Sequence, residues 1–172
     1  MRRLAASVLV LAMAGTARAQ PPHVRGEGGM QTLIDDAARR SPEIRASIDR
    51  LQDLDVTVYV RARLLRPLDL DGRIALLSTA AGHRYLVIEL ACNRTELTQM
   101  ATLGHELFHA IEIAEEPSAV SAETVATLYT RIGIKTGDRL GLRTYETEAA
   151  AAAGLRARRE LLTSTTRHGH GT

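Results

Sequence analysis

The stretch Met100–Ala114, MATLGHELFHAIEIA, decides how the rest of the chain is interpreted. Its apolar residues recur at spacings of three and four, which predicts a helix with one buried face. His105 and His109 stand four residues apart, so on a helix their imidazoles lie one turn above each other on the same face. Both rings can therefore direct a nitrogen at one point, at the distance of about 2.0–2.1 Å that zinc–histidine bonds require.

Glu106 completes the pentapeptide His-Glu-Leu-Phe-His at 105–109. Its side chain is rotated away from the shared histidine face, yet it reaches a water on the open side of a metal held there. A carboxylate in that place is suited to act as a general base. Gly104 costs about 1 kcal/mol relative to alanine inside a helix, so we expect it to allow close packing near the metal. The motif predicts a zinc hydrolase centre, and the alternative is a packed helix without metal.

The first 19 residues have the pattern of a secretory signal peptide. Two arginines precede a short apolar stretch over 4–14, and the triplet Ala-Arg-Ala at 17–19 supplies a cleavage site. We therefore expect export, to the periplasm or outside the cell, after cleavage near Ala19. The apolar stretch is too short to span a bilayer comfortably, and no later segment approaches 18 apolar residues, so no membrane span is expected.

Charge and cysteine content narrow the possible partners. The chain has 22 basic and 20 acidic side chains, and three of the arginines lie in the first 19 residues. Cleavage would leave 19 basic against 20 acidic groups, so we expect no nucleic-acid partner. Cys92 is the only cysteine, which excludes an internal disulfide framework, and its place after an apolar run predicts a buried thiol.

The N-terminal half of the mature chain predicts two helices followed by strands. Residues 20–29 are rich in proline and glycine and are expected to form a flexible lead-in, and residues 30–40 have helical spacing. Ser41-Pro42-Glu43 supplies an N-cap, a first-position proline and a first-turn acid for a second helix that ends near Gln52. Alternation then predicts a strand over 56–61 and a hairpin from the runs 73–80 and 84–90.

The C-terminal half is expected to be mainly helical. After the motif helix we expect, in order, a helix over 118–132, a loop over 134–141, an alanine-rich helix from about 145 to 162 and a disordered polar tail over 163–172. These elements predict one α+β domain over 30–162, in which a small, mostly antiparallel sheet packs against helices that include the motif helix.

A catalytic zinc site takes three protein ligands and leaves one position for water, so a third ligand is needed. We favour Glu146, because small residues near it would let the alanine-rich helix approach the motif helix closely; Glu148 in the same turn is a fallback. Glu123 is the other fallback, although the helix dipole alone explains an acid in a first turn. Glu112 shares the histidine face but lies about 10 Å along the axis from His105, which favours an orienting role.

Four segments occur in an order that resembles a group of small exported bacterial metallopeptidases of the zincin type, gluzincin-like and of uncharacterised function. These segments are Ser41–Arg45, Asp55–Val60, Leu103–Ala114 and Tyr145–Thr147. The likeness extends from about residue 37 to 162, and the HExxH pentapeptide is its specific part. It implies a minimal zincin-like domain in which the strand before the motif helix, here 84–90, forms the edge along which an extended substrate lies.

The resemblance also implies roles for single residues. It gives His105 and His109 as ligands of one Zn²⁺ ion and Glu106 as the general base, and it favours Glu146 over Glu123. The resulting hypothesis is zinc-dependent hydrolysis of a peptide or protein substrate.

Two points stay open in the sequence. Candidate donors to the oxyanion or substrate are Tyr145, Arg143, His83 and Tyr129, and no pattern chooses among them. The alternative function is an exported, non-catalytic domain that binds a metal or a partner on a zincin scaffold. The short chain and the scarcity of aromatic residues, 3% of the total, favour that alternative.

Overall fold

The computed structural model describes residues 21–65, 70–139 and 142–168. The described part contains five helices and six strands and has an α+β fold, as expected. The elements in chain order are β1 (Val24–Gly26), α1 (Met30–Arg40), α2 (Pro42–Gln52), β2 (Val56–Arg63), β3 (Gly72–Ala80), β4 (His83–Ala91), α3 (Glu96–Glu115), α4 (Ala122–Ile132), β5 (Ile134–Arg139), β6 (Leu142–Glu146) and α5 (Glu148–His168). The segment expected to be the export signal, 1–19, lies outside the described residues.

Four strands form one mixed sheet in the order β1-β2-β4-β3. The pairs β1–β2 and β2–β4 are parallel, and β3–β4 is the expected antiparallel hairpin. The sheet is therefore not mostly antiparallel, because the chain crosses from β2 to β3 and then returns through β4 between them. The substrate edge expected over 84–90 is also wrong, since β4 is an interior strand and β3 is the outer one.

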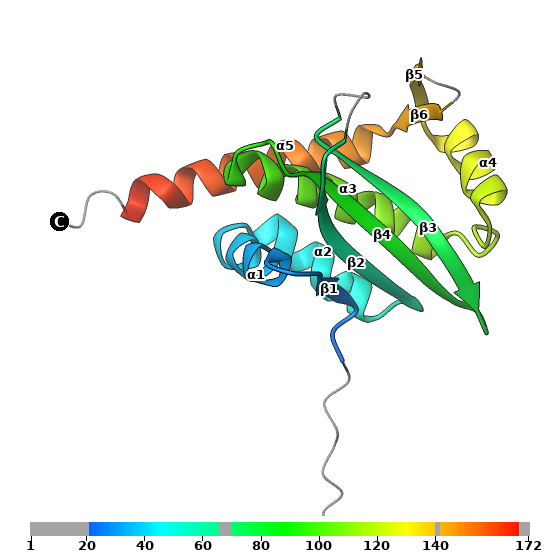
Figure 1. The fold of residues 1–172 in the computed structure, drawn as a ribbon, viewed down its shortest axis with the longest axis horizontal. Helices are drawn as coiled ribbons and strands as arrows, with labels where there is room; N and C mark the ends of the chain where they lie inside the picture. Colours follow the sequence, from blue (N-terminus) through cyan, green and yellow to red (C-terminus); the bar gives the residue numbers. More distant parts are fainter. Residues whose placement is uncertain (1–20, 66–69, 140–141, 169–172) are drawn as a thin grey trace, which may run out of the picture.

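The helices lie against one face of this sheet (Figure 1). Alternate residues of the strands, among them Val58, Leu86 and Ile88, are fully buried on that face and form the core with α3. Helix α5 packs on α3 (Figure 1). A Cβ atom at Gly104 would lie 2.8 Å from the Cβ of Ala157 on α5, which confirms the expected close packing at this glycine.

Capping side chains account for where α2 and α3 begin. Helices α1 and α2 occupy the expected ranges, and the Ser41 side chain accepts a hydrogen bond from the N–H of Ile44 at the start of α2. The Thr95 side chain accepts from the N–H of Thr98 at the start of α3. In the described part of the chain, no helix has both the length and the apolar character that crossing a bilayer requires.

Four expectations about local structure are wrong. The lead-in over 20–29 contains strand β1, which pairs with β2. The segment expected as a loop over 134–141 contributes β5 of a two-stranded sheet, with 140–141 outside the description. The tail expected from 163 continues α5 as far as His168. Cys92 is exposed rather than buried, because it follows the last residue of β4.

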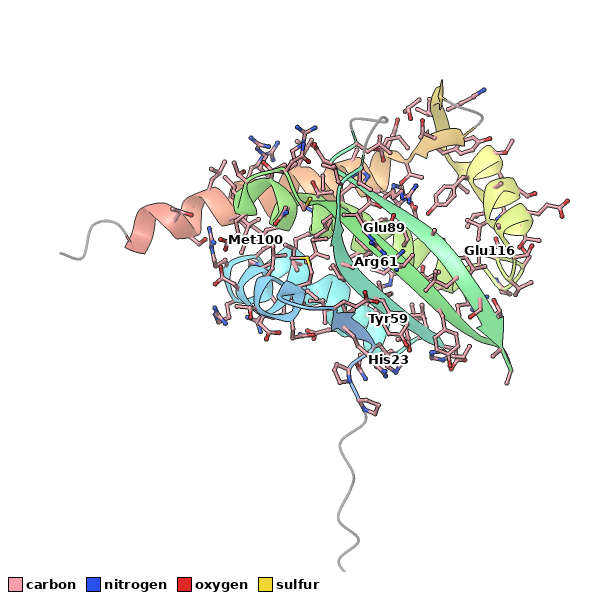
Figure 2. The ribbon with its side chains drawn as sticks, viewed as in Figure 1. His23, Tyr59, Arg61, Glu89, Met100 and Glu116 are labelled. Atoms are coloured by element: carbon pink, nitrogen blue, oxygen red, sulfur yellow. The ribbon has the colours of Figure 1, made fainter. Side chains whose placement is uncertain are left out.

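The other face of the sheet carries no helix of the described part (Figure 1) and is organised around one carboxylate. Glu89 on β4 is only 4% exposed and accepts hydrogen bonds from Arg61 at 2.9 and 2.6 Å and from Arg73 at 2.5 Å (Figure 2). The Nε of Arg63 lies 3.7 Å from the same carboxylate. Burial alone would raise the pKa of Glu89, but the hydrogen bonds from Arg61 and Arg73 hold it below its ordinary value of 4.5.

The lowered pKa of Glu89 predicts a pH-dependent contribution to stability. A group whose pKa falls on folding stabilises the fold above its unfolded-state pKa, and the contribution is lost as the pH falls through the folded-state value. We therefore expect Glu89→Gln to lower the free energy of unfolding by about 2 kcal/mol at pH 7, with the difference from wild type shrinking as the pH falls below about 4.5. Urea unfolding measured from pH 7 to pH 3 checks this.

The matched control is Glu27→Gln, at an exposed carboxylate in the turn after β1. It should change the free energy of unfolding by less than about 0.5 kcal/mol at every pH. A difference between wild type and Glu89→Gln that stays constant from pH 7 to pH 3 would contradict the assignment.

Candidate metal centre

Two imidazoles and one carboxylate converge beside α3. The rings of His105 and His109 have centroids 4.8 Å apart. The carboxylate of Glu146, from the end of β6, brings Oε2 to 3.4 Å from Nε2 of His105 and Oε1 to 3.6 Å from Nε2 of His109. Ligands held at about 2.1 Å from a tetrahedral ion are themselves about 3.4 Å apart. The spacing of these three side chains therefore fits one metal ion.

Of the three glutamates considered from the sequence, only Glu146 joins the histidines. Among the described residues, the group of ligating side chains that could hold an ion is His105, His109 and Glu146. Glu123 and Glu148 lie in the first turns of α4 and α5 and are exposed. Glu146 itself ends strand β6 rather than opening the alanine-rich helix, which begins at Glu148 instead of at about 145 as expected.

His109 is oriented from behind by Glu112. Its Nδ1 lies 2.7 Å from Oε2 of Glu112, so the ring directs Nε2 toward Glu146. The Tyr129 hydroxyl lies 3.2 Å from the same Nδ1 and donates to the carbonyl oxygen of His109 at 3.3 Å. A carboxylate behind a ligating histidine fixes the tautomer and ring orientation and raises the basicity of the ligand. This contact fits the orienting role expected for Glu112, which stays a prediction.

Thr147 connects the start of α5 to these groups, and sequence reasoning missed it. Its hydroxyl accepts from the N–H of Ala150 at 3.1 Å, as an N-cap does, and donates to Oε1 of Glu112 at 2.7 Å. Its backbone N–H donates to Oε1 of Glu146 at 2.8 Å. A threonine directly before an acidic residue and an alanine run is an N-cap signal, so its helix-starting role was open to prediction.

Close packing against α5 holds His105. A Cβ atom at Gly154 would lie 3.0 Å from the Cβ of His105 and 3.4 Å from its Nδ1. The backbone of Ala150 also hydrogen bonds the ring of His105. Any side chain at Gly154 would therefore press on this ligand.

Glu106 is buried between α3 and the edge strand β3. It is 6% exposed, and a Cβ atom at Gly72 would lie 3.1 Å from its Oε1. Burial raises the pKa of Glu106 to about 7; the positive charge of His109 opposes this rise and the negative charge of Glu146 adds to it. A carboxyl group with that pKa can both take up and release a proton near neutral pH.

The ligating groups influence one another's protonation in the metal-free protein. Burial lowers the pKa of His105, and the charge of His109 lowers it further. Burial also opposes the charging of His109, but hydrogen bonds with Glu112 and Glu146 outweigh it and raise the pKa of that imidazole to about 9. Burial would raise the pKa of Glu146, yet the two histidines hold it below its ordinary value.

His83 is not part of this centre. It pairs with Ala80 at the turn of the β3–β4 hairpin, whereas Gly72, at the other end of β3, lies beside Glu106. Eight residue steps along the strand separate Gly72 from Ala80, which is roughly 26 Å. The His83 ring instead lies 2.9 Å from the hydroxyl of Thr57, so its expected role as a donor at the site is wrong.

The two tyrosine candidates differ: Tyr129 contacts the back of the His109 ring, whereas Tyr145 faces another side. Adjacent residues of a strand face opposite sides, so Tyr145 points away from the side on which Glu146 meets the histidines. Its ring stacks on Tyr129 with centroids 6.4 Å apart, and its hydroxyl lies 3.2 Å from that of Thr130. Tyr129 braces His109 from behind. The side chain of Arg143 lies outside the described residues.

The geometry predicts which glutamate contributes to metal affinity. We expect Glu146→Ala to weaken zinc binding by more than about 100-fold, because removing a ligand should cost more than removing an orienting partner, which costs about 10- to 100-fold. Glu148→Ala, two residues away and exposed, should leave the affinity unchanged. Competition with a chromogenic chelator measures both variants. Similar affinities for the two variants would remove Glu146 from the ligand set.

The contact behind His109 makes a separate prediction. Glu112→Gln keeps the shape of the side chain but removes its charge, so we expect zinc affinity to fall by about 10- to 100-fold with all three ligands present. Glu115→Gln, at an exposed residue one turn further along α3, is the control and should have no effect. Unchanged zinc affinity in Glu112→Gln would show that the contact does not tune the ligand.

Comparisons of this chain with models of protein families, with curated proteins and with solved structures found no match. Assignment of the metal centre therefore depends on the positions of the side chains themselves. The resemblance to zincin-type peptidases stays a prediction drawn from the sequence.

Proposed function

We propose that this protein is a zinc-dependent peptidase in which Glu106 is the general base. The observation that carries the proposal is the convergence of His105, His109 and Glu146 at distances that suit one ion, beside a buried carboxylate. Two imidazoles and a carboxylate are a ligand set of hydrolytic zinc sites, which keep one position for water.

Within this proposal each residue has one task. Zinc, when bound, acts as a Lewis acid that makes water nucleophilic near neutral pH. Glu112 keeps His109 in the tautomer that presents Nε2 to the ion. Glu106 accepts a proton from the attacking water and delivers it to the amine that leaves the cleaved peptide bond.

Strand β3 is the proposed support for an extended substrate. It is the outer strand next to the site, so its outward-facing backbone groups can pair with a peptide. A Cβ atom at Gly72 would lie 2.5 Å from Cγ2 of Thr102 and 3.1 Å from Oε1 of Glu106, so the missing side chain lets β3 pack closely against Glu106 on α3. The signal peptide expected over 1–19 would make the substrate a peptide or protein outside the cytoplasm.

Replacing the proposed base separates hydrolysis from metal binding. We expect zinc-loaded Glu106→Gln to lose about 10²- to 10⁴-fold of its activity on a casein-type substrate, because the water loses its proton acceptor, while its zinc content stays at one ion per chain. Proteolysis and elemental analysis of the same preparations provide the two measurements. Glu96→Gln, in the exposed first turn of α3, is the control and should retain wild-type activity.

Three other outcomes are informative. Equal turnover by wild type and Glu106→Gln would remove Glu106 as the base. Wild-type protein that binds zinc but cleaves nothing would favour the non-catalytic, metal-binding alternative. Protein that acquires no zinc from solution would reject the metal centre altogether.

A further inference from the structure

Strand β3 presents two different surfaces to anything that pairs with its edge. Neighbouring residues of a strand point to opposite faces of the sheet. Gly72 faces the helices and lies beside Glu106, so the next residue, Arg73, points to the face without helices. A peptide paired with β3 would therefore place one side chain toward the metal ligands and the adjacent one beside Arg73.

The face around Arg73 has more positive than negative charge. The carboxylate of Glu89 on β4 meets three guanidinium groups, those of Arg61 and Arg63 on β2 and that of Arg73 on β3. The side chains of Arg63 and Arg73 are 58% and 46% exposed, whereas that of Glu89 is 5% exposed. One buried negative charge thus lies beneath an exposed positive surface.

Glu89 also fixes the direction of these arginines. Arg73 contacts Oε2 of Glu89 through its Nε and a terminal nitrogen, both at 2.5 Å, and Arg61 contacts Oε1 in the same two-nitrogen manner (Figure 2). A guanidinium group has five N–H donors, so donors remain on each arginine beyond those that face Glu89. Arginines held in this way are suited to bind a further carboxylate.

We propose that Arg73, supported by Arg63, selects peptides that carry an aspartate or glutamate next to the bond that is cut. A residue directly opposite Arg73 on a paired strand has its Cβ atom about 4.5–5.5 Å away, which places an acidic side chain within reach of the guanidinium group. A lysine or arginine there would be repelled. This inference depends on the proposed peptidase function for the cleavage, whereas binding of the peptide can be measured without it.

The experiment uses zinc-loaded protein and a set of peptides that differ in only one residue. That residue is Glu, Gln or Lys, and it is placed in turn at each position within three residues of the cleaved bond. We expect kcat/KM to be about fivefold higher for Glu than for Gln at alternate positions, and lower still for Lys, because exposed charge pairs have effects of this size. The preference should decrease at high salt, since the pair is exposed.

Variants assign the preference to this face. Arg73→Gln should abolish the preference for Glu, and Arg73→Glu should reverse it in favour of Lys, with the all-neutral peptide still cleaved by both. Arg63→Gln should weaken the preference. This variant keeps the proposal testable if the Arg73 variants fail to fold, because Arg63 has the longest contact with Glu89, at 3.7 Å. Arg45→Gln, at an exposed position on α2, is the control and should keep the wild-type preference.

Two measurements distinguish the failure of this inference from the failure of the proposed function. Cleavage with the same kcat/KM for Glu, Gln and Lys peptides, or a preference that survives in Arg73→Gln, would overturn the inference and leave the peptidase intact. If no peptide is cleaved, the peptidase proposal fails. The acidic preference is then tested by measuring how tightly the Glu, Gln and Lys peptides bind to the Glu106→Gln protein. Tighter binding of Glu than of Gln peptides that is lost in Arg73→Gln supports the acidic preference, and equal binding overturns it.

Discussion

The close approach of α3 and α5 is the constraint on which the rest of the structure depends. Small residues make it possible: Gly104 meets Ala157, and Gly154 meets His105. Because the helices touch at these positions, the beginning of α5 and the residue before it, Thr147, lie beside the histidine face of α3. Glu146 then reaches both histidines although it lies about forty residues further along the chain.

Hydrogen bonds then fix the positions of the side chains around His109. Thr147 caps α5 and contacts Glu112, Glu112 contacts His109, and Tyr129 on α4 supports the same histidine. The Glu112–His109 contact lies within α3, whereas Thr147 joins the start of α5 to α3 and Tyr129 joins α4 to it, so side chains from three parts of the fold fix the His109 ring. A site that brings two imidazoles and buried carboxylates together this closely is expected to need such support, because unsupported charges would move apart or change protonation.

Local patterns were sufficient for the features that depend on neighbours in the sequence. Ser41 begins α2 where expected, and the one-turn spacing of His105 and His109 places both rings on one side of α3. Glu146 was chosen because small residues follow it, and those residues do pack against α3. The supporting role of Thr147 went unseen, because its partner Glu112 lies 35 residues earlier.

Pairing between distant strands could not be predicted in the same way. The insertion of β4 between β2 and β3 is a matter of tertiary pairing, and it makes β3 rather than β4 the outer strand. His83 looked as available as any other polar residue, but its register partner Ala80 places it at the far end of the hairpin. The β5–β6 hairpin was missed because Gly137, opposite Thr144 next to a bulge, has the composition of a loop.

Glu146 is the one ligand that comes from the small β5–β6 sheet, whereas both histidines belong to α3. An ion bound by all three side chains would cross-link this hairpin to α3. Part of the free energy of ion binding would then order β5 and β6, and the observed affinity for the ion would be lower by that amount. Chelation should accordingly loosen β5 and β6 first, and the amide hydrogens of 134–139 and 142–146 should exchange faster while the sheet of four strands keeps its protection.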